Sequence, residues 1–376
     1  MTPKSINKNI NVVHVIWSAS FGGIEKVVMD LCKSQLQLPD TSPSILIGKK
    51  EGQFQKQLET SGVPHVYAGF RNGKDLSFKL YKKLRSVFHG ADLIHIHTFN
   101  PLIALAASTS RKPVLYTIHG NFGFGRKLNK FEKFNKFLLK IFLKNYVAHI
   151  SCNSKFTQNT AINHYGISTT NSTIVFNGIP VEHTSSHKTT IQNSAINKLK
   201  NKFVIGTTSR FAGFKRIDRL IEAFSFIATK IPDSALLLVG DGILRKKLEE
   251  QVNELKLSDK VIFAGYQQDV ASYQSAMDVC VFPSENEPFG LVAIETLLLG
   301  KPTIVFEDGG GMKEILANTY EEDIVKNSSE LCKRILHYYQ FPVTDIEREN
   351  RAKFAKGFGI KKMAQNIGAL YIKILS

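Results

Sequence analysis

Cysteines and long apolar runs are scarce in this chain of 376 residues, and their scarcity excludes several classes of protein. The four cysteines, Cys32, Cys152, Cys280 and Cys332, form no C-x-x-C pair, so the sequence indicates neither a zinc site nor a disulfide framework. No apolar run approaches the length of a membrane-spanning helix, and the N-terminus lacks the apolar stretch of a signal peptide. We therefore expect a cytoplasmic protein with buried, reduced thiols.

Two familiar binding motifs are missing as well. The sequence has no G-x-G-x-x-G fingerprint, which argues against an enzyme that uses a nicotinamide cofactor. It has no Asp-x-Asp pair at the end of a predicted strand and no evident constellation of metal ligands, so we expect no metal cofactor. Lone strand histidines such as His95 and His97 are expected to be structural.

Acidic residues are scarce in the first half of the chain only. Residues 1–180 contain 23 Lys and Arg against 8 Asp and Glu, a net charge of +15. Residues 181–376 contain 26 against 24, a net charge of +2. This asymmetry predicts a polyanionic partner for the first half, either nucleic acid or an anionic membrane surface. We expect the nearly neutral second half to bind a small ligand.

Lysine and phenylalanine dominate the segment 127–144. Its phenylalanines and leucines recur at helical spacing among lysines, and Glu132 is its sole acid. This composition is typical of a helix that lies on an anionic bilayer. The alternative is an ordinary amphipathic helix whose apolar side packs on a sheet.

Short apolar runs rich in β-branched residues alternate with longer amphipathic ones, which predicts a parallel α/β architecture. We expect two doubly wound, Rossmann-like domains, residues 1–181 and 202–345, facing a central cleft where ligands bind at the carboxyl ends of the strands. The polar segment 182–201 is the predicted linker, and 346–376 should form C-terminal helices, one of which could cross back to the first domain. The predicted strands are Asn11–Trp17, Ser44–Gly48, His65–Ala68, Leu93–His97, Val114–Ile118, Val147–Cys152, Thr173–Phe176, Phe203–Thr208, Ala235–Val239, Val261–Ala264, Val279–Phe282 and Thr303–Phe306.

Two glutamates, Glu287 and Glu295, bracket the most distinctive stretch of the chain. Glu287 lies in the loop after strand 279–282, and Glu295 lies in the apolar helix that follows and ends near Gly300. The first N–H groups of this helix have no partner within it, so they form an anion site with an acid on either side. Each carboxylate could hold hydroxyls of a ligand whose phosphate lies between them. The amides concerned belong to Phe289, Gly290 and Leu291.

Basic residues follow the first strand of the second half. Arg210 and Lys215 lie five residues apart on the loop after strand 203–208. A guanidinium group together with an ammonium group suits a diphosphate better than either alone, and two solvated loop cations are the alternative. In the first half, His119 ends a predicted strand and would face the cleft in this topology.

Glycine-rich turns follow several other strands. Gly22 and Gly23 stand between the first strand and a helix, where the backbone can approach a phosphate closely. Gly265 and Tyr266 follow strand 261–264 and could frame a nucleotide base by backbone contacts. Ordinary turn chemistry would explain both pairs equally well.

Together these segments resemble the retaining glycosyltransferases of the GT-B fold, in particular the bacterial Glu-x7-Glu group, glycosyltransferase family 4. The resemblance covers nearly the whole chain, and the order and spacing of 209–218, 239–242 and 287–295 agree with the family as well as their residues. Two features depart from it. Many members have glycine where this chain has Pro288, and the loop 307–314 follows the family's Gly-Gly loop only loosely, which leaves the roles of its acids open.

The resemblance implies a role for each matching residue. Arg210 and Lys215 would hold the diphosphate of a nucleotide-sugar donor, linked to UDP or GDP. Glu287 would bind hydroxyls of the transferred sugar, Glu295 would bind the ribose, and His119 would lie beside the reactive face of the sugar. Backbone contacts to sugar and phosphate are implied for Phe289, Gly290 and Leu291 and, from the first domain, for Gly22 and Gly23.

The sequence thus favours a membrane-associated transferase that moves a sugar from a nucleotide donor to a glycan or lipid-linked glycan in the synthesis of cell-surface polysaccharide or glycolipid. Family members are metal-independent and are thought to retain configuration by attack from the same face. A GT-B sugar-nucleotide epimerase or hydrolase is the second enzymatic hypothesis. A basic nucleic-acid-binding protein is the non-enzymatic one, and no recognition motif accompanies the charge to support it.

Overall fold

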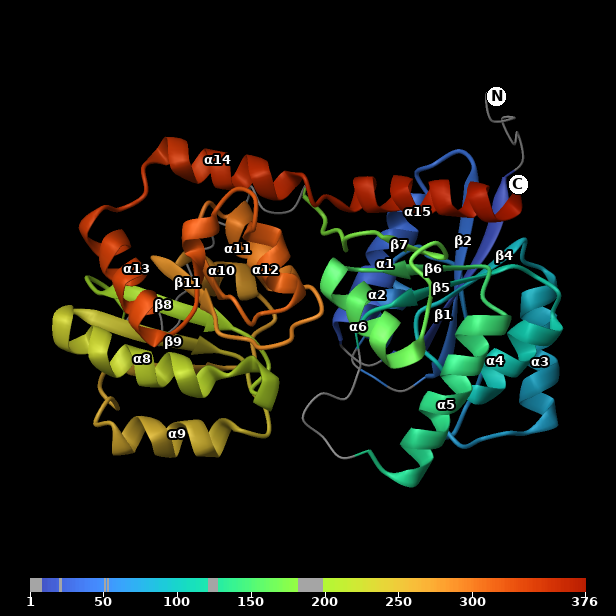
Figure 1. The fold of residues 1–376 in the computed structure, drawn as a ribbon, viewed down its shortest axis with the longest axis horizontal. Helices are drawn as coiled ribbons and strands as arrows, with labels where there is room; N and C mark the ends of the chain where they lie inside the picture. Colours follow the sequence, from blue (N-terminus) through green and yellow to red (C-terminus); the bar gives the residue numbers. More distant parts are fainter. Residues whose placement is uncertain (1–8, 20–21, 51, 53, 121–127, 182–198) are drawn as a thin grey trace. The chain divides into compact units, whose positions relative to one another are not determined.

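The computed structural model describes residues 9–19, 22–50, 52, 54–120, 128–181 and 199–376. The chain forms two compact units, which are α/β units built on one sheet each (Figure 1). Unit 1 contains Met1–Pro180 and Gly359–Ser376, and unit 2 contains Val181–Phe358. The predicted linker, 182–201, lies outside the described residues up to position 198.

The sheet of unit 1 is parallel, with seven strands in the order β3-β2-β1-β4-β5-β6-β7. The strand order reverses between β1 and β4, which makes the carboxyl ends of these strands the topological switch point. The elements are β1 (Ile10–Ser18), α1 (Gly23–Gln35), β2 (Thr41–Lys49), α2 (Gln55–Glu59), β3 (His65–Tyr67), α3 (Phe78–His89), β4 (Leu93–Ile96), α4 (Pro101–Thr109), β5 (Val114–Ile118), α5 (Lys130–Asn145), β6 (His149–Cys152), α6 (Lys155–Tyr165), β7 (Ser172–Ile174) and α15 (Ile360–Leu375).

Successive side chains along a strand point to opposite faces of the sheet, and helices cover both faces of the sheet in unit 1. On β1, Val13 and Val15 join the core under α3, α4 and α5, whereas Ile16 joins the core under α1 and α2. Figure 1 shows α3, α4 and α5 side by side in this unit. On the other face α15 packs against α1, so residues at even positions of β1, such as His14, meet these two helices.

The sheet of unit 2 is also parallel, with six strands in the order β10-β9-β8-β11-β12-β13, and its switch point lies between β8 and β11. Its strands are almost continuous apolar runs, as expected for a parallel sheet that is buried on both faces. The elements are β8 (Phe203–Thr208), η1 (Gly213–Lys215), α8 (Ile217–Lys230), β9 (Ser234–Val239), α9 (Arg245–Glu254), β10 (Val261–Gly265), α10 (Val270–Ser275), β11 (Val279–Phe282), α11 (Leu291–Leu298), β12 (Thr303–Phe306), α12 (Gly311–Leu316), η2 (Glu321–Asp323), β13 (Ile324–Val325), α13 (Ser328–Gln340) and α14 (Asp345–Lys356).

The structure confirms the predicted fold class, and every predicted strand is present within a few residues of its expected bounds. The sequence missed β13, a two-residue strand at the edge of the second sheet. The C-terminal segment 346–376 is divided between the units, because α14 belongs to unit 2 and α15 to unit 1. The chain rejoins unit 1 through a bridge between Ile179 and Gly359.

Candidate functional site

An ion pair connects the loop after β8 to the loop after β11. Lys215, at the end of η1, donates from Nζ to Oε2 of Glu287 at 2.6 Å, and both side chains are only 13% exposed. The backbones of the two loops also meet, since the N–H of Glu285 donates to the carbonyl of Phe214 at 2.8 Å. The two loops leave neighbouring strands at the switch point, which is where ligands bind in open α/β sheets.

Arg219 fixes the shape of the loop after β11. Its Nε donates to the carbonyl of Pro283 at 2.7 Å, and its Nη2 donates to the carbonyl of Ser284 at 3.1 Å. Its two Nη atoms form a bidentate pair with Asp308 at 2.8 and 2.9 Å, and its guanidinium group stacks on the ring of Phe306. Sequence reasoning missed Arg219, because its partners lie 64 to 89 residues away along the chain.

The glycine-rich loop before α12 supports Glu287 from behind. The N–H of Asn286 donates to the carbonyl of Asp308 at 2.9 Å, and the N–H of Gly311 donates to the carbonyl of Glu287 at 2.7 Å. Gly310 has a φ of +63°, and a Cβ at this position would meet the backbone of Glu287. The loop 307–314, which follows the family pattern only loosely, therefore holds the backbone of Glu287 in place. Its Asp308 is also the ion-pair partner of Arg219.

Helix α11 begins beside this ion pair. Its N-cap residue Gly290 has a φ of +97°, and any Cβ there would collide with the side chain of Met312, so only glycine fits. Among the described residues, the N–H groups of Gly290 and Leu291 have no hydrogen-bond partner, as expected at a helix start. Phe289 is buried in the core, and Glu295 is a partly exposed residue inside α11.

The remaining predicted residues of unit 2 lie at the carboxyl ends of β8 and β10. Arg210 is exposed, and its guanidinium group forms no ion pair or hydrogen bond with any residue that the structure describes. Gly265 accepts a hydrogen bond from the N–H of Gly240 at 2.8 Å, which ties the ends of β9 and β10 together, and Tyr266 beside it is 51% exposed. Arg210, Lys215, Gly265, Glu287 and the start of α11 thus occupy one edge of the sheet of unit 2.

Three of the predicted residues, Gly22, Gly23 and His119, belong to unit 1. Gly22 is the extended N-cap of α1 and Gly23 its first residue; positions 20 and 21 lie outside the described residues. Burial raises the pKa of the nearby Glu25.

His119 follows β5 directly and shares a hydrogen bond of 3.0 Å between its Nε2 and Nδ1 of His97. Burial lowers the pKa of His119 to about 4, so the imidazole is neutral at neutral pH.

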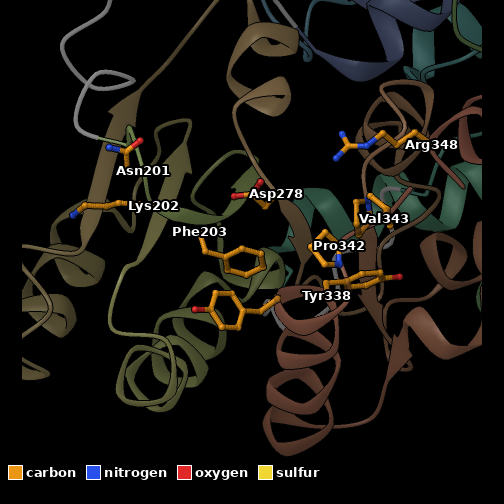
Figure 2. Close-up of a pocket in the computed structure, with 10 residues that line it drawn as sticks. Asn201, Lys202, Phe203, Asp278, Tyr338, Pro342, Val343 and Arg348 are labelled. Atoms are coloured by element: carbon orange, nitrogen blue, oxygen red, sulfur yellow. The ribbon is translucent and has the colours of Figure 1, made fainter. Parts of the chain in front are cut away.

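A cavity of about 340 Å³ lies at the opposite edge of the sheet of unit 2 (Figure 2). Phe203 stands at the start of β8 and Asp278 just before β11, so the cavity opens at the amino ends of these strands. The ring of Tyr338 and the side chain of Arg348 also line it. Lys215 and Glu287 lie beyond the carboxyl ends of the same strands, so the cavity is not part of the candidate site.

Comparison with known proteins agrees with this architecture. The model of the family described as Glycosyltransferase Family 4 matches residues 21–183, and that of Glycosyl transferases group 1 matches residues 189–355. The first match begins after β1 and covers the other strands of the sheet of unit 1, and the second covers the sheet of unit 2. The chain therefore belongs to the glycosyltransferases of the GT-B fold.

Some individual relatives match over nearly their whole length. The chain is 25% identical to UDP-Gal:alpha-D-GlcNAc-diphosphoundecaprenol alpha-1,3-galactosyltransferase of Escherichia coli, and the match covers 99% of both chains. The crystal structure of Anabaena HepE in complex with UDP and glucose is similar with a TM-score of 0.79 and 22% identity, over 96% of this chain and 99% of that one. At this identity the structural likeness establishes the fold alone. Within the described residues, no helix combines the length and the apolar character needed to cross a membrane.

Proposed function

We propose that the protein is a retaining glycosyltransferase that moves a sugar from a UDP- or GDP-linked donor to a glycan or lipid-linked glycan acceptor without a metal ion. One observation carries the proposal. Arg210, the Lys215–Glu287 pair and the start of α11, whose Gly290 and Leu291 amides have no partner among the described residues, all follow strands β8 and β11 at the switch point of the second sheet. This edge offers cations and N–H dipoles for a diphosphate beside a carboxylate for hydroxyl groups.

The chemistry of sugar transfer explains this combination. Breaking the bond between a sugar and a diphosphate builds positive charge on the anomeric carbon and negative charge on the departing diphosphate. Arg210, Lys215 and the amides of α11 would stabilise the negative charge as it grows, which makes a divalent cation unnecessary. Glu287 accepts a hydrogen bond from Lys215 and is braced by Gly311, so we assign it to positioning of sugar hydroxyls and not to nucleophilic attack.

The known relatives support both the donor and the acceptor class. The name of the Escherichia coli relative specifies a UDP-linked sugar as donor and a diphosphoundecaprenol-linked sugar as acceptor. The Anabaena structure contains UDP and glucose. We therefore favour UDP over GDP as the nucleotide and a lipid-linked glycan as the acceptor, within cell-surface polysaccharide or glycolipid synthesis.

Donor binding is the first test. A panel of UDP- and GDP-sugars should contain one that raises the melting temperature of the protein, because a ligand that binds only the folded state stabilises it by mass action. Arg210→Ala should remove this shift while the melting temperature of the free protein stays unchanged, since the side chain of Arg210 has no hydrogen-bond or ion-pair partner in the described part of the chain. Lys230→Ala, which removes one exposed charge at the far end of α8, is the matched control and should keep the shift. An unchanged shift in Arg210→Ala would overturn the assignment.

Product analysis separates transfer from epimerisation and hydrolysis. With donor and a lipid-linked acceptor we expect a glycosylated acceptor whose new linkage has the anomeric configuration of the donor, as read by NMR. Turnover of donor to an epimer or a free sugar at the same rate without acceptor would favour the epimerase or hydrolase instead. Activity should survive EDTA, and a requirement for a divalent cation would contradict the metal-independent mechanism.

We also propose that unit 1 binds an anionic membrane surface. In α5, Phe131, Phe134 and Phe137 are 37%, 55% and 58% exposed, whereas only the end of the helix, at Phe142, is buried in the core. Exposed lysines alternate with these rings, and α3, which packs against α4 on the same face of the sheet, adds Phe78, which is 67% exposed. Aromatic rings among lysines suit the headgroup region of an anionic bilayer. The same membrane would carry a lipid-linked acceptor.

Liposome sedimentation tests this membrane surface. A variant with Lys133, Lys136, Lys140 and Lys144 changed to glutamine should lose binding to vesicles that contain anionic lipid. The control carries the same loss of charge on unit 2, at Lys230, Lys246, Lys247 and Lys353, and should bind like the wild type. Equal binding by both variants would remove α5 from the membrane surface. We expect no binding of nucleic acid by any of these proteins.

A further inference from the structure

A chain of hydrogen bonds runs through buried histidines of unit 1 and ends at His119. His14 on β1 is fully buried, and His97, next after β4, is 4% exposed. The chain begins at Gln35 in the last turn of α1, whose Oε1 lies 2.9 Å from Nε2 of His14. Nδ1 of His14 lies 3.0 Å from Nε2 of His97, and Nδ1 of His97 lies 3.0 Å from Nε2 of His119.

The donor and acceptor roles along this chain follow from its first link. The amide oxygen of Gln35 can only accept, so Nε2 of His14 carries the proton and Nδ1 of His14, in a neutral ring, is an acceptor. Nε2 of His97 must then donate to His14, which makes Nδ1 of His97 an acceptor. It follows that Nε2 of His119 donates to His97, and that Nδ1 of His119 carries a free lone pair.

A second branch of hydrogen bonds contacts the Gln35 amide. Nε2 of Gln35 donates to the hydroxyl of Tyr371, on α15, at 3.2 Å. The same hydroxyl lies 2.7 Å from Nδ1 of His95, and Nε2 of His95 lies 2.7 Å from Oγ1 of Thr117. The hydroxyl of Tyr371 also lies 3.3 Å from Nε2 of His14, so it contacts both ends of this branch. The direction of the chain follows from the orientation of the Gln35 amide in the structure, and turning that amide over would reverse every bond from His14 to His119.

The same histidines could be considered as ligands of a metal ion. His14, His95 and His97 have ring nitrogens within 4.8 Å of one another. However, both ring nitrogens of each of the three already have a hydrogen-bond partner in the described structure. A metal ion would have to break several of these bonds inside a buried site. The geometry therefore favours a hydrogen-bonded network.

We propose that Gln35, His14 and His97 are positioning residues that hold His119 in its Nε2–H tautomer, so that Nδ1 accepts a hydrogen bond from a hydroxyl group of the sugar ligand. This inference rests on the proposed function and on the role that the family resemblance implies for His119, beside the transferred sugar. Within the described residues, Nδ1 of His119 has no partner, so it is the open end of the chain. A neutral imidazole locked in this way can only accept at Nδ1, and it selects a ligand hydroxyl as the donor.

Protonation would disrupt the chain, which is consistent with its role. A second proton on His14 would set its Nδ1–H against the Nε2–H of His97, two donors facing each other. Burial already lowers the pKa of His14 to about 4 and that of His119 to about 4. The network is therefore neutral and keeps one direction at the pH of the cytoplasm.

NMR of the free protein labelled with 15N-histidine tests the tautomer directly, without any substrate. We expect His119 to show a protonated Nε2 and an unprotonated Nδ1. Tyr371→Phe removes only a hydroxyl group, so it should fold, and it should increase the share of the Nδ1–H form because the Gln35 amide is no longer held. A wild-type His119 with its proton on Nδ1, or a tautomer mixture unchanged by Tyr371→Phe, would overturn the proposal. Added zinc should leave the spectrum unchanged, and a zinc-induced shift of these histidines would favour the metal site.

Kinetics then tests the consequence for the ligand. His97→Leu should lower kcat/KM on the order of tenfold, the value of one ordinary hydrogen bond. His97→Gln should restore most of it, because an amide group can accept from His119 and donate to His14. His149→Gln alters another buried strand histidine, paired with Thr173 at 2.8 Å, and should have little effect. Equal losses in all three variants would indicate a merely structural role. If no donor is turned over by the wild type, the proposed function fails while the tautomer result still stands.

Discussion

Replacing both Lys215 and Glu287 should destabilise the protein no more than replacing either one singly. The two charged atoms lie 2.6 Å apart with side chains 13% exposed, so neither charge is well solvated. At an effective dielectric constant of about 20 their attraction is roughly 6 kcal/mol, most of which offsets the desolvation of the two groups. Removing one partner leaves the other charge poorly solvated and without its counter-ion. We expect Lys215→Met and Glu287→Gln each to cost about 2 kcal/mol of unfolding free energy, below the value for a fully buried pair.

A double-mutant cycle measures this coupling. Urea unfolding of the wild type, Lys215→Met, Glu287→Gln and the double variant, followed by circular dichroism, should give a coupling energy of about 2 kcal/mol, with the double variant no less stable than either single one. Lys246 and Glu250, an exposed pair with atoms 3.9 Å apart, provide the control cycle and should couple by less than about 0.5 kcal/mol. A coupling at Lys215–Glu287 as small as in this control would refute the reasoning that the site holds its lysine through Glu287.

Three further predictions concern stability. Asp323→Asn should cost about 3–5 kcal/mol in urea unfolding, because the fully buried carboxylate pairs with Arg334 at 2.6 Å and Arg351 at 3.1 Å. Gly290→Ala should lower the melting temperature, since its φ of +97° and the lack of space both exclude a side chain, and an unchanged value would contradict this geometry. The pKa of His14 is 6.5 in the unfolded chain and about 4 in the folded protein, where burial disfavours the charged form. The unfolded chain therefore takes up a proton first, and the free energy of unfolding falls as the pH drops from 6.5 towards 4. Wild type should therefore lose about 2 kcal/mol more than His14→Gln between pH 7 and pH 5.

Much of the fold could be predicted because parallel strands buried on both faces are continuous apolar runs. The strands Phe203–Thr208 and Val279–Phe282 have the bounds that the sequence predicts. β13 was missed because two residues with one neighbouring strand leave almost no pattern. The split of the last segment between the units could not be predicted, since the helical pattern of Ile360–Leu375 says nothing about which sheet it covers.

The candidate site was predicted in part, for a related reason. Loops at the carboxyl ends of parallel strands can be located from the strands themselves, so Arg210, Lys215 and Glu287 could be grouped in advance. Arg219 could not be grouped with them, because it acts through hydrogen bonds to backbone carbonyls of a loop that is distant in the sequence. The chain of hydrogen-bonded histidines could be predicted only in part. The i, i+2 spacing of His95 and His97 indicates a shared face of one strand, but their neighbours depend on the order of strands in the sheet.

The charge distribution of unit 2 shows how a nearly neutral half of the chain can offer a positive site. Its loop cations are mostly neutralised by acids of neighbouring loops: Arg216 pairs with Glu285 at 2.9 Å, and Arg219 pairs with Asp308 at 2.8 Å. These pairs hold the loops in place and leave little charge for a ligand. Arg210 is the exposed exception among the described residues of these loops. It follows β8 at the carboxyl ends of the strands, as the amides of α11 follow the neighbouring strand β11. A diphosphate would therefore meet one unpaired guanidinium and a set of N–H dipoles, and it would compete with Glu287 for Lys215. Affinity for the nucleotide should accordingly depend more on Arg210 than on the net charge of the domain.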